Sequence, residues 1–229
     1  MDRHTRPPAQ FPPVQKLSPR VPHRSAQLNQ ADLIAKYLHE DGHRAWGFVI
    51  YRCTYQSNTA WNEFMRCLLA DTEEMLEGDL GLDLLDNLAL TVFEDSRSFD
   101  GAATAVVRDH FNRWAATAVQ QEQGTGPGVV GSQRYRYCIQ VTQDALDSVL
   151  AGEEGGFVRV IRGDWEDYEP YEGGERLEAE QEAIEGCTLE DVGWIKVPFE
   201  GVMVLPWCYL REDWGWETEY RRPPEIACF

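Results

Sequence analysis

The histidines near residue 40 form the most specific chemical motif in the chain. The string His39-Glu40-x-x-His43 matches the H-E-x-x-H pattern. In that pattern one helical turn places two imidazoles on a zinc ion, and the glutamate activates a bound water. Glu63, on the next predicted helix, is the candidate third ligand. These residues would make the protein a zinc metallopeptidase with Glu40 as its general base.

Two features of the sequence weaken this motif. Gly42 lies inside it, and a glycine costs about 1 kcal/mol in a helix interior. The chain also has to become a strand by Trp46, so we expect the helix to end at Gly42 and to leave His43 outside. A helix end with solvated histidines and acidic residues is therefore the favoured interpretation, and no cofactor is expected.

His110, Arg52 and Tyr51 are the candidate acid–base groups of a cofactor-free enzyme. His110 falls on the edge of the apolar stripe of a predicted helix, where an imidazole can exchange protons near neutral pH. No Ser or Cys nucleophile with an orienting carboxylate can be paired with it from the sequence. The alternative is that His110 is a structural residue at the core boundary, with its ring nitrogens hydrogen-bonded within the protein. As catalytic groups, the three residues would serve an isomerase or cyclase with a sheet-lined pocket.

Three arginines in predicted strands are the candidate ligand-binding residues. If their strands pair, Arg52, Arg134 and Arg136 form a positive patch that would hold a carboxylate-bearing ligand. The alternative is that they extend toward water or pair with the abundant acidic residues. The patch is the best small-molecule hypothesis that the sequence offers.

Charge restricts the partners of the protein. The 229 residues hold 21 Lys and Arg against 39 Asp and Glu, and the net charge of −18 repels phosphate backbones. We therefore expect no nucleic-acid binding. Residues 1–27 are basic and proline-rich and predict a disordered arm, with a docking segment as the alternative. Residues 164–191 form an acidic insert, interpreted as a solvated loop or an acidic docking surface.

Hydrophobicity and cysteine usage bear on the compartment. No apolar run approaches the roughly 20 residues of a membrane span, and the basic start lacks the apolar core of a signal peptide. The six cysteines are scattered and contain no Cys-x-x-Cys pair. These features predict a cytoplasmic protein with reduced thiols and no membrane contact.

Hydrophobic periodicity predicts the elements that must position these residues. Helices are expected at 29–39, at 102–121, from a Ser57 or Asn58 cap to the residue before Gly78, and from a Thr142 cap to Ala151. Strands are expected at 46–55, 88–94, 134–141, 156–162 and 192–197. The strand at 46–55 is apolar on both faces and should be central, whereas the alternating strand at 134–141 should have one wet face. Residues 28–229 are thus expected to form one α+β domain. We predict a ferredoxin-like fold, with a mixed or antiparallel sheet and two long helices packed on one face.

Two segments carry a resemblance to known proteins. The run WGFVIYRCTY at 46–55, followed by Trp61 and Phe64, and the run DVGWIKV at 191–197 are similar to a widespread group of uncharacterised filamentous-fungal proteins. The resemblance implies a fungal intracellular origin and is compatible with a role in small-molecule biosynthesis. It implies no catalytic residue, because that group has no established activity.

The sequence therefore favours an interaction or small-ligand-binding protein, whose partner is a protein or a small molecule. The alternatives are the cofactor-free isomerase or cyclase and the zinc metallopeptidase. The oligomeric state is left open.

Overall fold

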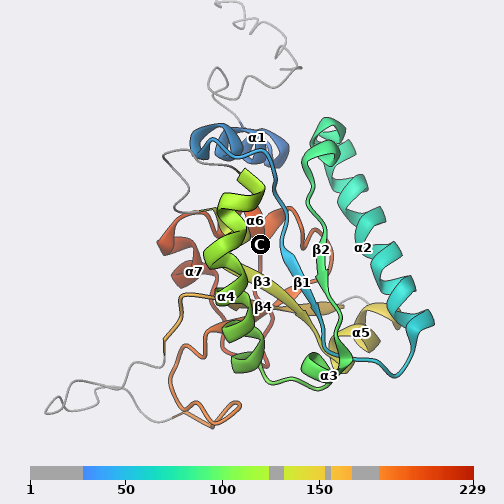
Figure 1. Cartoon of the computed structure of the whole chain (residues 1–229), viewed down its shortest axis with the longest axis vertical. Helices are drawn as coiled ribbons and strands as arrows, with labels where there is room; N and C mark the ends of the chain where they lie inside the picture. The colour runs from blue at the N-terminus through green and yellow to red at the C-terminus, as the bar shows by residue number, and fades with distance from the viewer. Residues whose placement is uncertain (1–27, 124–131, 153–155, 167–180) are drawn as a thin grey trace, which may run out of the picture.

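A mixed sheet forms the centre of the protein. The computed structural model describes residues 28–123, 132–152, 156–166 and 181–229. Within them, five strands pair in the order β2-β1-β3-β4-β5, and Figure 1 labels the first four of this order. Strands β2, β1 and β3 are parallel, whereas β4 and β5 each run antiparallel to the preceding strand in the sheet. The predicted α+β class with a mixed sheet is confirmed. The strands are β1 (Val49–Arg52), β2 (Thr91–Phe93), β3 (Tyr137–Val141), β4 (Phe157–Arg162) and β5 (Trp194–Pro198).

Helices surround this sheet, and the longest begins where the sequence predicts. The Ser57 side chain accepts a hydrogen bond from the Ala60 amide, which caps the first turn of α2. Its apolar stripe of Trp61, Phe64 and Leu68 is buried in the core. The helices are α1 (Gln30–Asp41), α2 (Asn58–Gly78), α3 (Ser96–Phe99), α4 (Thr104–Gln123), α5 (Gln143–Leu150), α6 (Leu205–Tyr209) and α7 (Asp213–Glu219), with short 3-10 helices at Leu82–Asn87 and Gln133–Tyr135.

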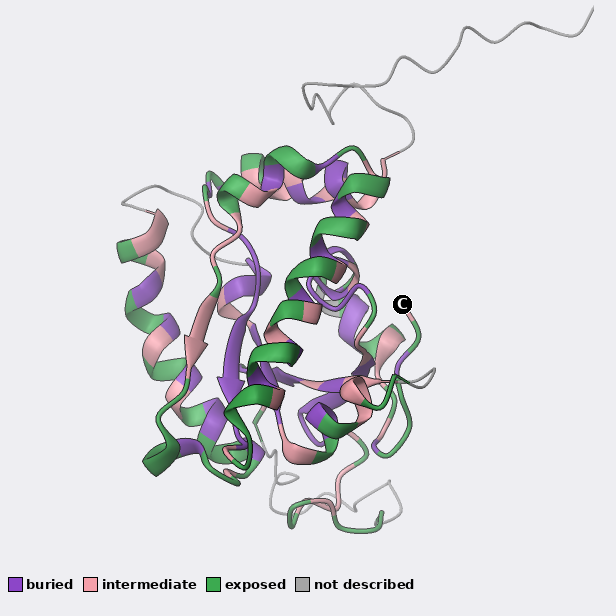
Figure 2. Ribbon diagram, turned by 90° about the vertical axis from the view of Figure 1, so that its right-hand side faces the viewer, coloured by how far each residue is buried: buried purple, intermediate pink, exposed green. Residues whose placement is uncertain are grey.

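The expectation that the two long helices share one face of the sheet is wrong. Ile50 of β1 packs in the core cluster of α2, while its neighbour Tyr51 packs in the cluster of α4. Figure 2 shows the two helices on opposite sides of the sheet. After β1 the chain runs through α2 to β2, which pairs with one edge of β1. It then runs through α4 to β3, which pairs with the other edge of β1. Right-handed crossovers in opposite directions place their helices on opposite faces. The ferredoxin-like arrangement is not confirmed.

Strand β3 also differs from its prediction. All five of its residues are buried, so the expected wet face does not exist. Cys138 lies under the α4 side and Ile139 under the α2 side. A strand covered by helices on both faces is buried whatever its polar alternation suggests.

Parts of two predicted segments lie outside the described residues. These are the whole basic arm at 1–27 and residues 167–180 of the acidic insert. The described end of the insert contains a short bridge between Ile184 and Cys187. Within the described ranges, no helix combines the length and apolarity needed to cross a membrane.

Candidate functional site

The histidine motif is split by the end of α1. The helix ends at Asp41, and Gly42 takes a left-handed conformation with φ of 66°, where its amide bonds to the last carbonyls of the helix. His43 therefore lies beyond the helix, as the glycine predicts. The two histidines of the motif do not occupy one helical face.

The remaining members of the proposed zinc site also lie apart. Glu63 forms a two-bond ion pair with Arg66 on the exposed side of α2, with distances of 2.9 and 2.6 Å. His43 is buried, and neither of its ring nitrogens has a hydrogen-bond partner among the described residues. No cluster of three or more potential metal ligands occurs within the described ranges. The geometry does not support the metallopeptidase hypothesis.

Two of the three predicted acid–base residues do meet. The Tyr51 hydroxyl oxygen lies 2.8 Å from His110 Nδ1, and the imidazole packs between the rings of Phe93 and Phe99. Burial raises the pKa of Tyr51 and lowers the pKa of His110. At neutral pH the hydrogen bond therefore joins a neutral phenol to a neutral imidazole.

Arg52 is separated from this pair. It follows Tyr51 in β1, so its side chain lies on the opposite face of the sheet. Its guanidinium lies over the rings of Tyr55 and Trp61, at 4.5 and 5.1 Å from their centroids. Nε donates to the Thr54 carbonyl and Nη2 to the Asn58 side chain. Arg52 thus ties the end of β1 to the start of α2.

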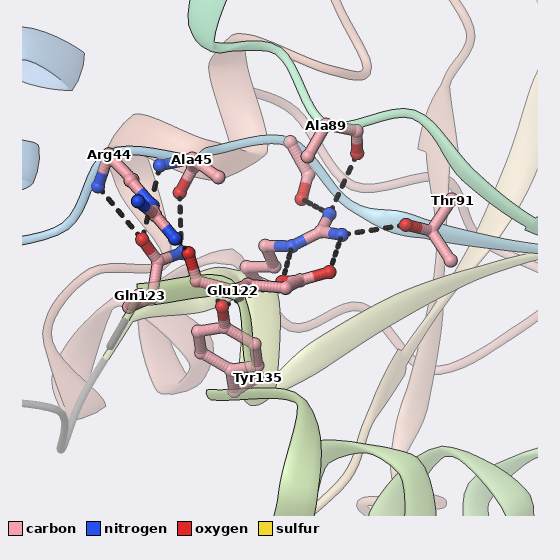
Figure 3. Close-up of polar contacts among 9 residues, drawn as sticks. Arg44, Ala45, Ala89, Thr91, Glu122, Gln123 and Tyr135 are labelled. Atoms are coloured by element: carbon pink, nitrogen blue, oxygen red, sulfur yellow. Dashed lines mark hydrogen bonds and ion pairs between the residues drawn. The ribbon is translucent and has the colours of Figure 1, made fainter. Parts of the chain in front are cut away.

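The Arg134 guanidinium lies in a fully occupied polar cluster, and Figure 3 labels its partners Ala89, Thr91 and Glu122. Nε and Nη2 bind the two carboxylate oxygens of Glu122 at 2.7 and 2.8 Å. Nη1 donates to the carbonyls of Gly47 and Ala89, and Nη2 also donates to the Thr91 hydroxyl. An arginine has five N–H donors, and all five are used. Arg134 has none left for a ligand.

The surrounding residues complete this cluster. The Tyr135 hydroxyl donates to Glu122 and accepts from Gln123. The Gln123 side-chain oxygen accepts from the Arg44 and Ala45 amides (Figure 3). The cluster therefore fastens the end of α4 to the segment that leads into β1. Its role is structural.

The predicted patch of three arginines does not form. Arg52 lies at the carboxyl end of β1, whereas Arg134 contacts Gly47 before its amino end. Arg136 donates from Nη1 to the Arg211 carbonyl. The prediction is wrong because Arg134 and Arg136 do not lie in a strand: they belong to the 3-10 helix before β3 and to its end, whereas Arg52 ends β1, which runs parallel to β3.

A different pair of cations lines a cavity of about 380 Å³ over β4 and β5. Arg159 of β4 and Lys196 of β5 are direct cross-strand partners. Side chains in that position lie on one face and close together, so two like charges there repel each other. The polar lining of the cavity has three basic and three acidic members: Arg159, Lys196, Arg222, Asp144, Glu182 and Glu185.

Arg159 is compensated by acidic neighbours. Its Nη1 lies 2.9 Å from a Glu185 oxygen, and its Nη2 lies 3.7 Å from an Asp144 oxygen. The guanidinium stacks over Trp194 at 4.5 Å from the ring centroid. Its Nε is buried and has no hydrogen-bond partner in the described part of the chain. Arg159 is therefore paired but, unlike Arg134, not saturated.

Lys196 forms no ion pair of this kind. Its Nζ lies 3.8 Å from the centroid of the Phe157 ring, and it makes no hydrogen bond or ion pair with any described residue. Burial lowers the pKa of Lys196, and the positive charge of Arg159 lowers it further against the opposing effect of Asp144. A half-buried ammonium without an acceptor favours an anion from outside.

Sequence reasoning missed this pair, although part of the signal was present. The alternation in FVRVIR places Arg159 opposite to Val158 and Val160, and WIKVP places Lys196 on one face with Trp194. Each strand thus shows a cation on its polar side. The pairing of the two cations depends on the register of β4 with β5, which the long insert between them hides.

No protein-family model, curated protein or solved structure matches this chain. The class that fold and site define is an α+β protein with a cavity on its mixed sheet that is lined by basic and acidic side chains. Its function has to be inferred from that geometry.

Proposed function

We propose that the protein binds a small carboxylate-bearing ligand in the cavity over β4 and β5. The observation that carries this proposal is the Lys196 ammonium, which lines the cavity without a hydrogen-bond acceptor from the described residues. The volume of about 380 Å³ lies within the range of small-molecule sites. A carboxylate would supply the charge-assisted hydrogen bond that Lys196 lacks.

The other walls suit such a ligand. Trp194 lines the cavity together with Pro223 and Pro224, and these side chains offer apolar surface to a hydrocarbon portion. The ligand class is the one that the sequence assigned to the arginine patch. The residues that would bind it are Lys196 and the other residues of the cavity lining, not the three arginines of that patch.

Butyrate and butyramide provide a matched test, because they have nearly the same shape and only butyrate is charged. Ligand-observed NMR should detect butyrate binding, and it should find butyramide about tenfold weaker or undetectable, as expected when a charged hydrogen bond is lost. Lys196→Gln should abolish this preference. Lys36→Gln removes a charge from the exposed side of α1 and serves as the control. Equal binding of the two compounds, or unchanged butyrate binding by Lys196→Gln, would refute the proposal.

A second candidate function rests on the bond between Tyr51 and His110. The imidazole is partly exposed and its Nδ1 is occupied by the phenol, so its Nε2 is the atom available for proton transfer. This supports the alternative of a cofactor-free isomerase or cyclase. His110→Gln should abolish turnover of a substrate found by screening while leaving the melting temperature within a few degrees. A large loss of stability with unchanged turnover would make the pair structural.

A further inference from the structure

A short hairpin separates the cavity from a second one. This hairpin, residues 181–188, is closed by backbone bonds between Gln181 and Thr188 and between Ile184 and Cys187. The second cavity, of about 320 Å³, lies against the start of α4. Ile184, Glu185 and Trp194 line both cavities. The hairpin therefore forms part of the wall between them, and we call it the plug.

The Glu185 carboxylate fixes the plug to the body of the protein. One oxygen accepts from the Thr104 amide at 2.8 Å, and the other accepts from the Thr104 hydroxyl and from Arg159 at 3.2 and 2.9 Å. An unpaired helix amide and a guanidinium are strong donors to carboxylates. Glu185 thus occupies a position that would suit a carboxylate of a ligand, and its side chain is still 33% exposed.

The charges of the cavity depend on the plug. With the plug in place, Arg159, Lys196 and Arg222 face an equal number of acidic residues. Two of those acids, Glu182 and Glu185, belong to the plug. Without them the three cations face Asp144 alone, which leaves an excess of two positive charges. A ligand with two negative charges would restore the balance.

The plug combines exposed residues with partly buried ones. Glu182, Ala183, Glu185 and Gly186 are exposed, and a bond from Arg222 to the Glu182 carbonyl adds to those of Glu185, whereas Ile184 and Cys187 pack against the core cluster of α4. Opening the plug therefore costs the burial of these two side chains, and the ligand has to supply that free energy. Displacement of the plug would join the two cavities.

We propose that the ligand is a dicarboxylate that displaces the plug, with one carboxylate on Lys196 and the other replacing Glu185 at Thr104 and Arg159. This inference rests on the proposed function of the cavity. The plug then acts as an internal competitor that lowers the apparent affinity for the ligand.

The test compares glutarate with butyrate on the full chain. NMR titration of the wild type should give at least tenfold tighter binding for glutarate, because the second carboxylate adds charge-assisted bonds. Glu185→Gln weakens the competitor and should tighten glutarate binding further, by about fivefold or more. Glu190→Gln removes the same charge from a nearby exposed residue outside the cavity lining and should leave both affinities unchanged.

Hydrogen exchange gives a second measurement on the same samples. The amides of Ile184 and Cys187 bond across the plug, so saturating glutarate should speed their exchange. Glutarate no tighter than butyrate, equal affinities of Glu185→Gln and wild type, or unchanged exchange would overturn the inference. If butyrate still binds through Lys196 in that case, only the plug is refuted. If neither ligand binds wild type or Glu185→Gln, the proposed function fails as well.

Discussion

Arg134, just before β3, and Arg159, within β4, show how the same side chain serves two purposes in one protein. Each guanidinium lies over a tryptophan ring and pairs with a glutamate. Arg134 is completely buried, and every donor has an acceptor in the protein. Arg159 is 17% exposed in a cavity beside Lys196, and both carry donors that no described residue satisfies. A saturated cation stabilises a fold, whereas unsatisfied cations around a cavity indicate a ligand.

The largest predicted effect is the loss of Arg134. Arg134→Met should reduce the free energy of unfolding by about 3–5 kcal/mol, because the substitution removes the cationic partner of the Glu122 carboxylate and one donor from each of two carbonyls. Urea denaturation measures this loss. If the variant does not fold, Arg134→Lys retains the charge with fewer donors and should show a smaller loss. A change below about 1 kcal/mol in Arg134→Met would show that the cluster is not structural.

Glu122, the partner of Arg134, should contribute more to stability than Glu185, the partner of Arg159. Glu122→Gln should cost roughly 1–3 kcal/mol, since the carboxylate accepts from Arg134 and Tyr135 in the cluster. Glu185→Gln should cost less than about 1 kcal/mol, since its ion pair is partly exposed. Parallel urea denaturation of the two variants checks this order. Equal losses, or a larger loss for Glu185, would contradict the contrast between the cluster and the cavity.

Lys196 should contribute almost nothing to stability. Lys196→Gln removes one of two like charges on directly paired residues, so stability should stay within about 0.5 kcal/mol of wild type or rise slightly. Thermal unfolding in the absence of ligand provides the measurement. A loss above roughly 2 kcal/mol would mean that the lysine is a structural residue like Arg134.

A further prediction concerns a carboxylate outside both regions. Burial raises the pKa of Asp71 from 3.8 to about 6, although the side chain accepts bonds from the Gly201 amide. The folded state then holds a proton that the unfolded state has released between pH 4 and 6. Stability should therefore fall across this window as pH rises, by on the order of 1 kcal/mol after allowance for partial exposure. Asp71→Asn should flatten this slope in denaturation series at pH 4, 5, 6 and 7, and an unchanged slope would exclude Asp71 as its source.

Local signals in the sequence predicted the elements well. The Ser57 cap and the apolar stripe after it define α2, and Gly42 ends α1. These features depend on residues within one or two helical turns. They also explain why the split of the histidine motif could be predicted.

Features that depend on tertiary structure were not predictable in this way. The two-faced packing follows from the strand order, and the site at Arg159 and Lys196 follows from a register between strands that are far apart in sequence. Arg134 and Arg52 were both predicted to lie in strands. The sequence around an arginine does not show whether its N–H donors will find acceptors in the folded protein. Tyr51 and His110 were named as members of one site, and their contact depends on α4 crossing the face that Tyr51 occupies.

The most direct test of the proposed site is a crystal structure of the protein grown with saturating butyrate. We predict a carboxylate oxygen within about 2.7–3.2 Å of Lys196 Nζ, with the hydrocarbon portion against Trp194. A ligand bound elsewhere, or a cavity that stays free of butyrate while Lys196 keeps its position, would contradict it.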